Sequence, residues 1–334
     1  MNRKIFSSIP LPQLVGQDMI GRIVHVGEKV KQNSSFKVGD RVCSLHEFLG
    51  GNSRYITLPP SRLVRVPDNV DVAKAACIVR TYLAAYQILY RTGVFEADNS
   101  QRILVCGANG NIGRAVIELA KVSRAKVYGA SRSRHRDFVE GRLGVPWVHS
   151  DPQRWSKLKN IDAVIDCVNY TGNFSDSKLP LKSTGVLICV GSSKMVRDTI
   201  RRQKKLNEDV QYDSDEEPIS SMCGACGTIS KKEAVYQTDI LSNVLSHITP
   251  KDMSLSIFIK QVSYDLFYNV EKHWDGCKED LEYLFLMLQR GKINPKVQHR
   301  VALNEVAVSH KLIESGGLQG AIVCVDDKTN SLTT

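Results

Sequence analysis

The chain has 334 residues, of which 42% are hydrophobic and 24% are charged. This composition fits a globular protein of two domains, or one domain inserted into another, and excludes bulk disorder, collagen and coiled coils. No run of roughly 18 apolar residues occurs, so a membrane span is not expected. The net charge of +10 favours an anionic ligand, whether a phosphorylated cofactor, nucleic acid or a lipid surface.

The nine cysteines indicate a reducing compartment. Their number is odd, and most stand singly in apolar runs, as Cys106, Cys167, Cys189 and Cys324 do. Such cysteines behave as small buried hydrophobic residues rather than as a disulfide framework. The cytoplasm is therefore the expected location. The basic, acid-free N-terminus leaves a mitochondrial presequence open as the alternative.

The first part of the chain, residues 19–66, has the pattern of a β domain. Short apolar runs separated by turn residues predict strands at 23–26, 41–44, 55–58 and 63–66. From about residue 70, helical and strand patterns alternate, which is typical of a parallel α/β sheet. The expected strands are 102–106, 126–130, 163–167 and 186–190, and an apolar stripe between Ile112 and Ala120 predicts a helix.

A charged insertion at 194–235 interrupts this alternation. Basic residues at 194–205 precede acidic residues at 208–217, where Ser214 resembles a kinase site, and Cys223 and Cys226 form a lone CxxC pair. A β-like stretch at 254–262 follows, and then a helix whose apolar face ends at Gly291. A strand at 297–303, a helix at 304–315 and a strand at 320–325 complete the predicted elements.

The most specific motif is the glycine-rich turn between the strand at 102–106 and the following helix. Glycines in this position let backbone N–H groups approach a pyrophosphate at the positive end of the helix dipole. The motif therefore predicts a dinucleotide site, and the alternative is a tight turn in a domain that has lost its ligand. The predicted contacts in this turn are Gly107, Asn109, Gly110, Asn111, Ile112 and Gly113.

The end of the next strand indicates which dinucleotide would bind. NAD sites usually carry an acid there, but Ser131 is followed by Arg132 and Arg134, and Asp137 is the first acid. Ser131, Arg132 and Arg134 are the predicted cofactor contacts at this strand end. An arginine can clamp a ribose 2′-phosphate, so NADPH (NADP) is predicted over NADH. The alternative is a solvated basic start to the next helix.

Several motifs in series resemble the medium-chain dehydrogenase/reductase superfamily, in its zinc-free, quinone-oxidoreductase-like (zeta-crystallin-like) branch. They are the stretches 15–27, 36–42 and 66–70, the glycine turn, 162–166, 185–191 and 320–323. The resemblance implies an α/β fold, in which a Rossmann-type doubly wound parallel sheet is inserted into a partial GroES-like β domain. The implied division is 1–74 for the GroES-like catalytic domain and 75–265 for the dinucleotide domain with its insertion at 194–235. Residues 266–327 return to the catalytic domain and 328–334 form a polar tail. The family also places several strands before the position of Gly16, so the chain is expected to be N-terminally short.

The resemblance argues against zinc. Zinc-containing relatives have a histidine where this chain has Gln17 and a cysteine where it has Arg80, and no set of three ligands can be assembled. The implied chemistry is zinc-independent hydride transfer from NADPH to a small-molecule electron acceptor, a quinone or an α,β-unsaturated carbonyl. Tyr86 and Asn169 are weak catalytic candidates, and Gly191 is expected to form a backbone wall beside the nicotinamide.

A second interpretation stays open. A chain with an incomplete substrate pocket could be a non-catalytic NADPH-binding or scaffold relative of the same family. The resembled proteins are often homodimers, which makes a homodimer an expectation here. The basic stretch at 194–205 has no interleaved aromatic residues, so no specific nucleic-acid partner is predicted.

Overall fold

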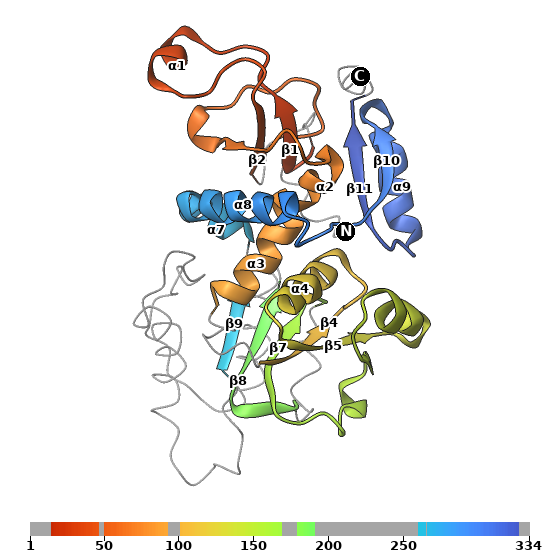
Figure 1. The fold of residues 1–334 in the computed structure, drawn as a ribbon. Helices are drawn as coiled ribbons and strands as arrows, with labels where there is room; N and C mark the ends of the chain where they lie inside the picture. Colours follow the sequence, from red (N-terminus) through yellow and green to blue (C-terminus); the bar gives the residue numbers. More distant parts are fainter. Residues whose placement is uncertain are drawn as a thin grey trace, which may run out of the picture. The chain divides into compact units, whose positions relative to one another are not determined.

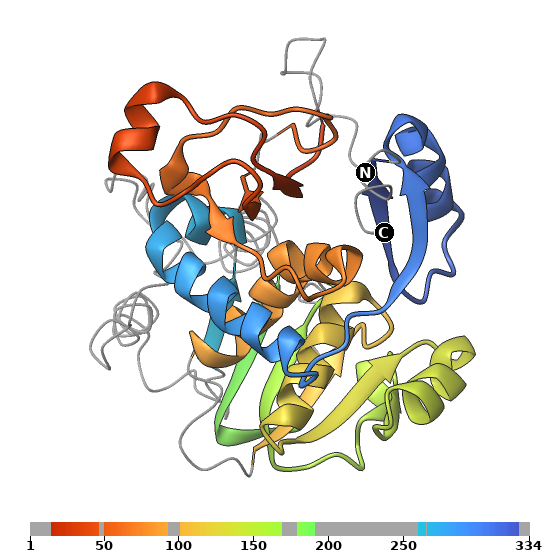
Figure 2. The ribbon, with the colours of Figure 1, turned by 45° about the horizontal axis from the view of Figure 1, so that its top comes forward.

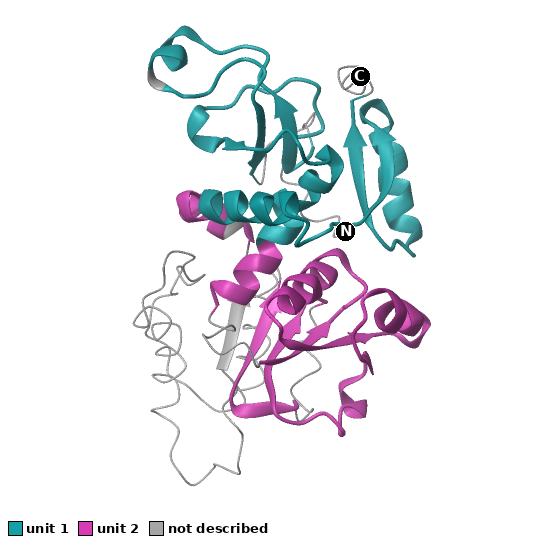
Figure 3. Cartoon of the chain, in the orientation of Figure 1, with its two compact units in different colours: residues 1–83, 277–334 teal, residues 84–276 magenta. Residues whose placement is uncertain are grey.

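The computed structural model describes residues 15–46, 50–92, 101–168, 179–190, 260–264 and 266–326. The chain divides into two compact units, residues 1–83 with 277–334 and residues 84–276 (Figure 3). The domain boundaries expected from the sequence lie between residues 74 and 75 and between residues 265 and 266. The first division between the units lies inside a helical segment, which runs through α2 (Val72–Cys77), the π-helical turn η3 (Ile78–Tyr82) and α3 (Leu83–Tyr90).

The second unit is built on a six-stranded sheet in the order β6-β5-β4-β7-β8-β9 (Figure 1). Every neighbouring pair is parallel, and this confirms the predicted α/β fold class with a doubly wound sheet. The strands are β4 (Arg102–Cys106), β5 (Lys126–Ser131), β6 (Trp147–His149), β7 (Ile161–Asp166), β8 (Leu181–Val190) and β9 (Lys260–Tyr264). The central strands are apolar because both of their faces are covered.

The strand order places a topological switch between β4 and β7. From β4 the chain builds the sheet outward through β5 and β6, and β7 then starts the opposite direction through β8 and β9. Ligands of open α/β sheets bind at the carboxyl ends of the strands beside such a switch. The helix α4 (Asn111–Val122) starts directly after β4 and packs against β4 and β5 (Figure 1).

A buried apolar cluster holds one side of this sheet together. It comprises Leu104, Cys106, Ala130, Trp155, Ile161, Val164, Leu187 and Cys189. The short helices of the unit are η4 (Ser133–His135), η5 (Phe138–Arg142), η6 (Pro152–Arg154) and α7 (Leu266–Lys272). Burial raises the pKa of the Cys106 and Cys167 thiols, so these cysteines stay protonated and unreactive, as their apolar sequence context indicates.

The first unit contains two small sheets. One is antiparallel, in the order β1-β2-β3, and the other is the parallel pair β10-β11. The strands are β1 (Asp18–Arg22), β2 (Arg41–Leu45), β3 (Val64–Arg65), β10 (Val297–Ala302) and β11 (Ala321–Val325). Its helices are α1 (Glu28–Asn33), η2 (Pro60–Arg62), α2, η3, most of α8 (Trp274–Gln289), η8 (Leu303–Glu305) and α9 (Val306–Ser315). In both views α9 lies along the β10-β11 pair (Figure 2).

Two predicted strands of this unit are wrong. The first strand ends at Arg22 instead of covering 23–26, and Val24, which is 65% exposed, does not pack into the core. Residues 55–58 form no strand, Tyr55 is 73% exposed, and the Pro59-Pro60 pair that follows starts a 3₁₀ turn. In both places no described strand pairs with the apolar residues, and a local pattern does not reveal whether a pairing partner exists.

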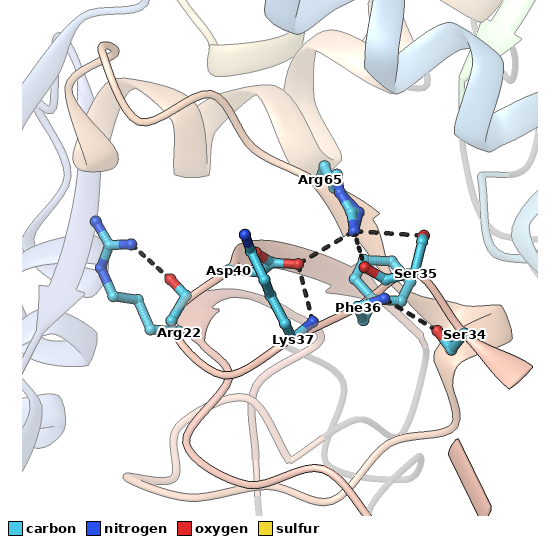
Figure 4. A network of polar contacts seen from close by, with 8 residues as sticks. Arg22, Ser34, Ser35, Phe36, Lys37, Asp40 and Arg65 are labelled. Atoms are coloured by element: carbon cyan, nitrogen blue, oxygen red, sulfur yellow. Dashed lines mark hydrogen bonds and ion pairs between the residues drawn. The ribbon is translucent and has the colours of Figure 1, made fainter. Parts of the chain in front are cut away.

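The turn before β2 is organised by one carboxylate (Figure 4). Oδ2 of Asp40 accepts hydrogen bonds from the Lys37 amide at 3.1 Å and from Arg65 Nη2 at 3.1 Å. The Arg65 guanidinium also lies 4.4 Å from the centroid of the Phe36 ring. Gly39 has a φ of +95°, a conformation that explains the glycine of this turn. These contacts hold the loop 34–40 against β3.

The helix α8 follows its prediction closely. Leu281, Leu284, Phe285 and Leu288 form its buried face, and Gly291 ends it with a φ of +64°. The Gly291 amide donates to the Leu288 carbonyl and the Lys292 amide to the Met287 carbonyl, so the last carbonyls of the helix are satisfied. In the part of the chain that the structure describes, no helix combines the length and the apolar character that crossing a membrane requires.

Candidate cofactor-binding site

Gly107 starts the turn that leads from β4 into α4. Its φ is +77°, and its amide donates to the Ala130 carbonyl at 3.0 Å, as the Ala108 amide does at 3.1 Å. A Cβ atom at position 107 would lie 2.5 Å from Cγ1 of Val168, in the segment after β7. Because both the backbone conformation and the space exclude a side chain, glycine is required here.

Gly110 and Gly113 let the turn close. The Gly110 amide donates to the Gly107 carbonyl at 2.9 Å, and a Cβ atom at position 113 would lie 2.3 Å from that carbonyl oxygen. Gly110 is also the N-cap of α4, a helix of 12 residues, and makes no side-chain cap. The first amides of α4 have no partner within the helix, and the positive dipole end that they form attracts an anion. This cradle of backbone fits a pyrophosphate.

Asn111 and Arg114 occupy the first turn of α4. Arg114 Nε donates to the Gly110 carbonyl at 3.2 Å, and its Nη2 donates to Oδ1 of Asn111. Sequence reasoning missed Arg114, although helical side chains point back toward the N-terminus and a residue at this position can reach the cap. The result is a cation beside the glycine turn, where it adds to the positive potential of the helix end.

The end of β5 carries the predicted cations. Arg132 and Arg134 are exposed, whereas Ser131 is buried with 3% of its surface exposed. Arg134 Nε donates to Nε2 of His135 at 3.1 Å. Burial, and then the charges of Arg134 and Arg132, lower the pKa of His135, so this imidazole is neutral at pH 7 and accepts the hydrogen bond. The turn therefore presents two permanent positive charges.

Position 17 and position 80 lie in the first unit, where zinc-containing relatives would have ligands. The Gln17 carbonyl accepts a hydrogen bond from the His46 amide at 2.9 Å, which fixes the start of β1. Burial raises the pKa of Asp18, and the charge of Arg80 lowers it to a smaller extent. Among the described residues, no three histidine, cysteine, aspartate or glutamate side chains group so that they could hold a metal ion.

Residues 1–68 match the family model of the alcohol dehydrogenase GroES-like domain. The quinone oxidoreductase of Lama guanicoe is 29% identical over 227 residues, which make up 64% of this chain and 67% of that protein. The quinone oxidoreductase structure from Coxiella burnetii has a TM-score of 0.62 and 19% identity, and the match covers 93% of this chain and 79% of that chain. The JamJ enoyl reductase structure has a TM-score of 0.66 and 17% identity over 93% of this chain and 78% of that chain.

These similarities support the resemblance of the chain to the quinone-oxidoreductase-like branch of the medium-chain dehydrogenase/reductase superfamily. The resemblance agrees with the one found in the sequence motifs. The similar proteins are oxidoreductases by name, and oxidoreductase chemistry in general is the activity that these similarities support. The alcohol dehydrogenase GroES-like match falls in the first unit, and the glycine turn lies in the second.

The second unit brings only some of the predicted site residues together. The glycine turn and the residues at the end of β5 meet through the hydrogen bonds from the Gly107 and Ala108 amides to the Ala130 carbonyl. Tyr86 lies on α3, where its ring stacks on Tyr90 with 4.5 Å between the ring centroids. Asn169, Gly191, the charged insertion at 194–235 with Ser214, and the Cys223–Cys226 pair lie outside the described residues.

Proposed function

We propose that this protein is an NADPH-dependent reductase that transfers hydride to a quinone or an α,β-unsaturated carbonyl compound without zinc. One observation carries the proposal. A glycine turn shaped for a pyrophosphate lies at the topological switch, and the neighbouring strand β5 ends in a turn with two exposed arginines. From Lys126 to Arg136 there is no carboxylate that could bind a ribose 2′-hydroxyl.

The chain's own residues would bind and orient the dinucleotide. Backbone amides of the turn from Gly107 to Gly113 would hold the pyrophosphate, and Arg132 and Arg134 would pair with the 2′-phosphate. When the reduced cofactor is bound, it supplies the hydride. Fixing the dinucleotide at both of these points orients the nicotinamide end, and orientation is the main contribution that a site without a catalytic triad can make. Tyr86 and Asn169 stay weak candidates for a catalytic role.

Zinc independence is supported by the charge at position 80. A catalytic zinc needs three protein ligands. At the position where zinc-containing relatives have a ligand cysteine, this chain has Arg80, which is permanently charged. The charge of Arg80 instead lowers the pKa of Asp18. A guanidinium group repels a divalent cation and cannot coordinate it, because it does not lose its proton in proteins.

The proposed acceptor follows from the names of the similar proteins. The quinone oxidoreductase of Lama guanicoe and the JamJ enoyl reductase share one type of acceptor, an electron-poor carbon conjugated to a carbonyl group. Hydride addition at such a carbon needs no metal, and the proton can come from water. We therefore propose conjugated carbonyl compounds as the substrate class.

Binding measurements with both nucleotides test this proposal. We expect wild-type protein to bind NADPH at least about tenfold more tightly than NADH, which corresponds to about 1.4 kcal/mol. Arg132→Ala and Arg134→Ala should reduce this ratio. Arg154→Ala is the matched control, because Arg154 is an exposed arginine of the same unit whose ion pair with Asp151 spans 3.9 Å.

The outcomes separate the two interpretations of this chain. Tight NADPH binding followed by oxidation of NADPH with quinones or enones supports the reductase. NADPH binding without turnover of either acceptor class supports the non-catalytic relative. If folded protein binds neither nucleotide, both the cofactor and the reductase activity are excluded.

A further inference from the structure

Trp147 connects the end of β5 to the edge strand β6. In the parallel ladder Trp147 is the partner of Gly129, and Ser131 is the partner of His149, so these four residues share one face of the sheet. The Trp147 indole Nε1 donates to Oγ of Ser131 at 3.1 Å. The Ser131 hydroxyl in turn donates to the Arg132 carbonyl at 3.4 Å. A chain of hydrogen bonds thus runs from the edge strand to the backbone of Arg132.

The ring of Trp147 makes a second connection. The Arg136 guanidinium lies 5.3 Å from the ring centroid, and Arg136 Nε donates to Oε2 of Glu140 at 3.0 Å. The ring also meets His149 edge-on, with 5.9 Å between the ring centroids. A cation held over an indole face by a carboxylate on the next turn has a restricted position. Trp147 therefore contacts Ser131, which directly precedes the turn 132–136, through its N–H group, and Arg136, the last residue of this turn, through its ring.

The burial of Ser131 explains what this arrangement does. Only 3% of its surface is exposed, and its oxygen already accepts from Trp147. Ser131 is thus better placed to brace the turn than to meet a ligand directly. The arginines that follow it are exposed, and their side chains are long and flexible. Fixing the backbone below such side chains lowers the entropy that is lost when they bind a phosphate.

We propose that Trp147 is a positioning residue for recognition of a 2′-phosphate. It braces Ser131 and the Arg132 carbonyl through its N–H group, and it holds Arg136 over its ring as a third cation beside Arg132 and Arg134. This inference rests on the proposed NADPH function and assigns its specificity to a residue outside the glycine motif and outside the turn itself. The sequence gives no signal for this role, because no motif includes Trp147 and its partner Ser131 lies 16 positions earlier.

The test uses nucleotides that lack the nicotinamide. Adenosine 2′,5′-bisphosphate carries the 2′-phosphate, adenosine 5′-monophosphate does not, and isothermal titration gives the ratio of their affinities. Trp147→Phe keeps a ring for Arg136 and removes the N–H group, and Ser131→Ala removes its acceptor. We expect each change to lower the ratio of affinities about three- to tenfold, which is the change that the loss of one hydrogen bond usually causes. The double variant should lower it no further than Ser131→Ala alone, because the Ser131 hydroxyl makes both hydrogen bonds of the chain and Trp147→Phe removes one of them.

Two further variants separate the ring from the N–H group. Trp147→Leu should lower the ratio more than Trp147→Phe, since it also removes the support of Arg136. Trp155→Phe is the matched control, because its indole donates to the His149 carbonyl at 2.7 Å in the same region of the unit. This control should lower the thermal stability and leave the ratio unchanged.

The outcomes distinguish a positioning role of Trp147 from a purely structural one. If Trp147→Phe lowers the melting temperature but leaves the ratio at its wild-type value, Trp147 is merely structural and the inference is wrong. Additive losses in Trp147→Phe and Ser131→Ala would also contradict it. A wild-type protein that does not prefer the bisphosphate would overturn the NADPH function itself, and the inference with it.

Discussion

Arg300 of β10 donates from Nη2 to Oδ2 of Asp71 at 2.7 Å, while Oδ1 of the same carboxylate accepts the Lys74 amide at 2.8 Å. Asp71 is the N-cap of α2, so one carboxylate both starts a helix and joins two segments 229 positions apart. This relationship ties the C-terminal part of the first unit to its N-terminal part. A second contact of the same kind joins Gln289 and Asn69 at 3.0 Å.

Removing this carboxylate should destabilise the protein. We expect Asp71→Ala to cost about 1 kcal/mol for the lost cap, plus about 0.5 kcal/mol for the exposed ion pair. Arg300→Ala should cost only the smaller part. Chemical denaturation followed by circular dichroism measures both changes, and equal losses in the two variants would show that the cap contributes nothing.

The same pair predicts a pH dependence. Burial raises the pKa of Asp71, but hydrogen bonds from the Lys74 amide and from Arg300 outweigh it, so the pKa in the folded state is lower than that of an ordinary aspartate. The stabilisation is therefore complete above the pKa of the unfolded chain and is lost as the pH falls through the lower pKa of the folded state. We expect Asp71→Asn to have a lower free energy of unfolding than wild type at pH 7. The same denaturation measurement at lower pH should show this difference shrinking below about pH 4.

The glycine turn should not tolerate a methyl group at position 113. Because that Cβ atom would lie 2.3 Å from the Gly107 carbonyl oxygen, Gly113→Ala must shift the turn. We expect a loss of NADPH affinity of at least about tenfold and a destabilisation of about 1–3 kcal/mol. Gly141→Ala is the control, since a Cβ atom there meets nothing within 4 Å. It should leave binding unchanged and raise the helical stability by up to about 1 kcal/mol.

A buried hydrogen bond connects α3 to the edge of the parallel sheet. The Tyr264 hydroxyl donates to Oε1 of Gln87 at 2.8 Å, and these residues are 4% and 0% exposed. Tyr264→Phe removes this donor from a buried acceptor and should cost about 1–2 kcal/mol in unfolding free energy. The control Tyr55→Phe changes a tyrosine that is 73% exposed and should have almost no effect. Similar losses in both variants would contradict the expected role of the hydrogen bond.

His135 should report on the charge of the turn after β5. Burial lowers its pKa, and the charges of Arg134 and Arg132 lower it further. Arg134→Ala should therefore raise the pKa of His135, as followed by its imidazole proton signals in a pH titration. Adenosine 2′,5′-bisphosphate bound to this turn should raise it as well, because a nearby dianion favours the imidazolium. An unchanged titration in the presence of saturating ligand would place the 2′-phosphate elsewhere.

Local sequence patterns predicted the central elements of the second unit well. The strand expected at 102–106 is β4 to the residue, and β5 extends one residue beyond the predicted 126–130. The strand expected at 163–167 starts earlier, at Ile161, and β8 starts five residues before its predicted beginning. Long apolar runs are reliable because a strand covered on both faces must be apolar throughout. Strand ends are less reliable, since pairing partners determine where a ladder stops.

The candidate site was predicted in part. The glycine turn could be found from the sequence because local backbone geometry requires glycine there. Gly107 has a positive φ, and Gly113 lies too close to the Gly107 carbonyl to carry a side chain. Arg132 and Arg134 could be found because the charge at the end of the second strand of a dinucleotide-binding sheet indicates which cofactor binds. Sequence reasoning missed Arg114, Arg136 and Trp147. Their contribution depends on which groups the ends of their side chains contact in the folded protein.

By itself, the sequence determined the alternation of elements, the glycine turn, the missing carboxylate after β5 and the resemblance to a family. These properties depend on neighbours along the chain, through backbone conformation and hydrophobic periodicity. Only the tertiary structure decided that β6 lies beside β5, that Trp147 reaches Ser131, and that Arg300 meets Asp71. Such contacts form between segments that the backbone brings together from distant positions, and no local pattern encodes the partner of a long side chain.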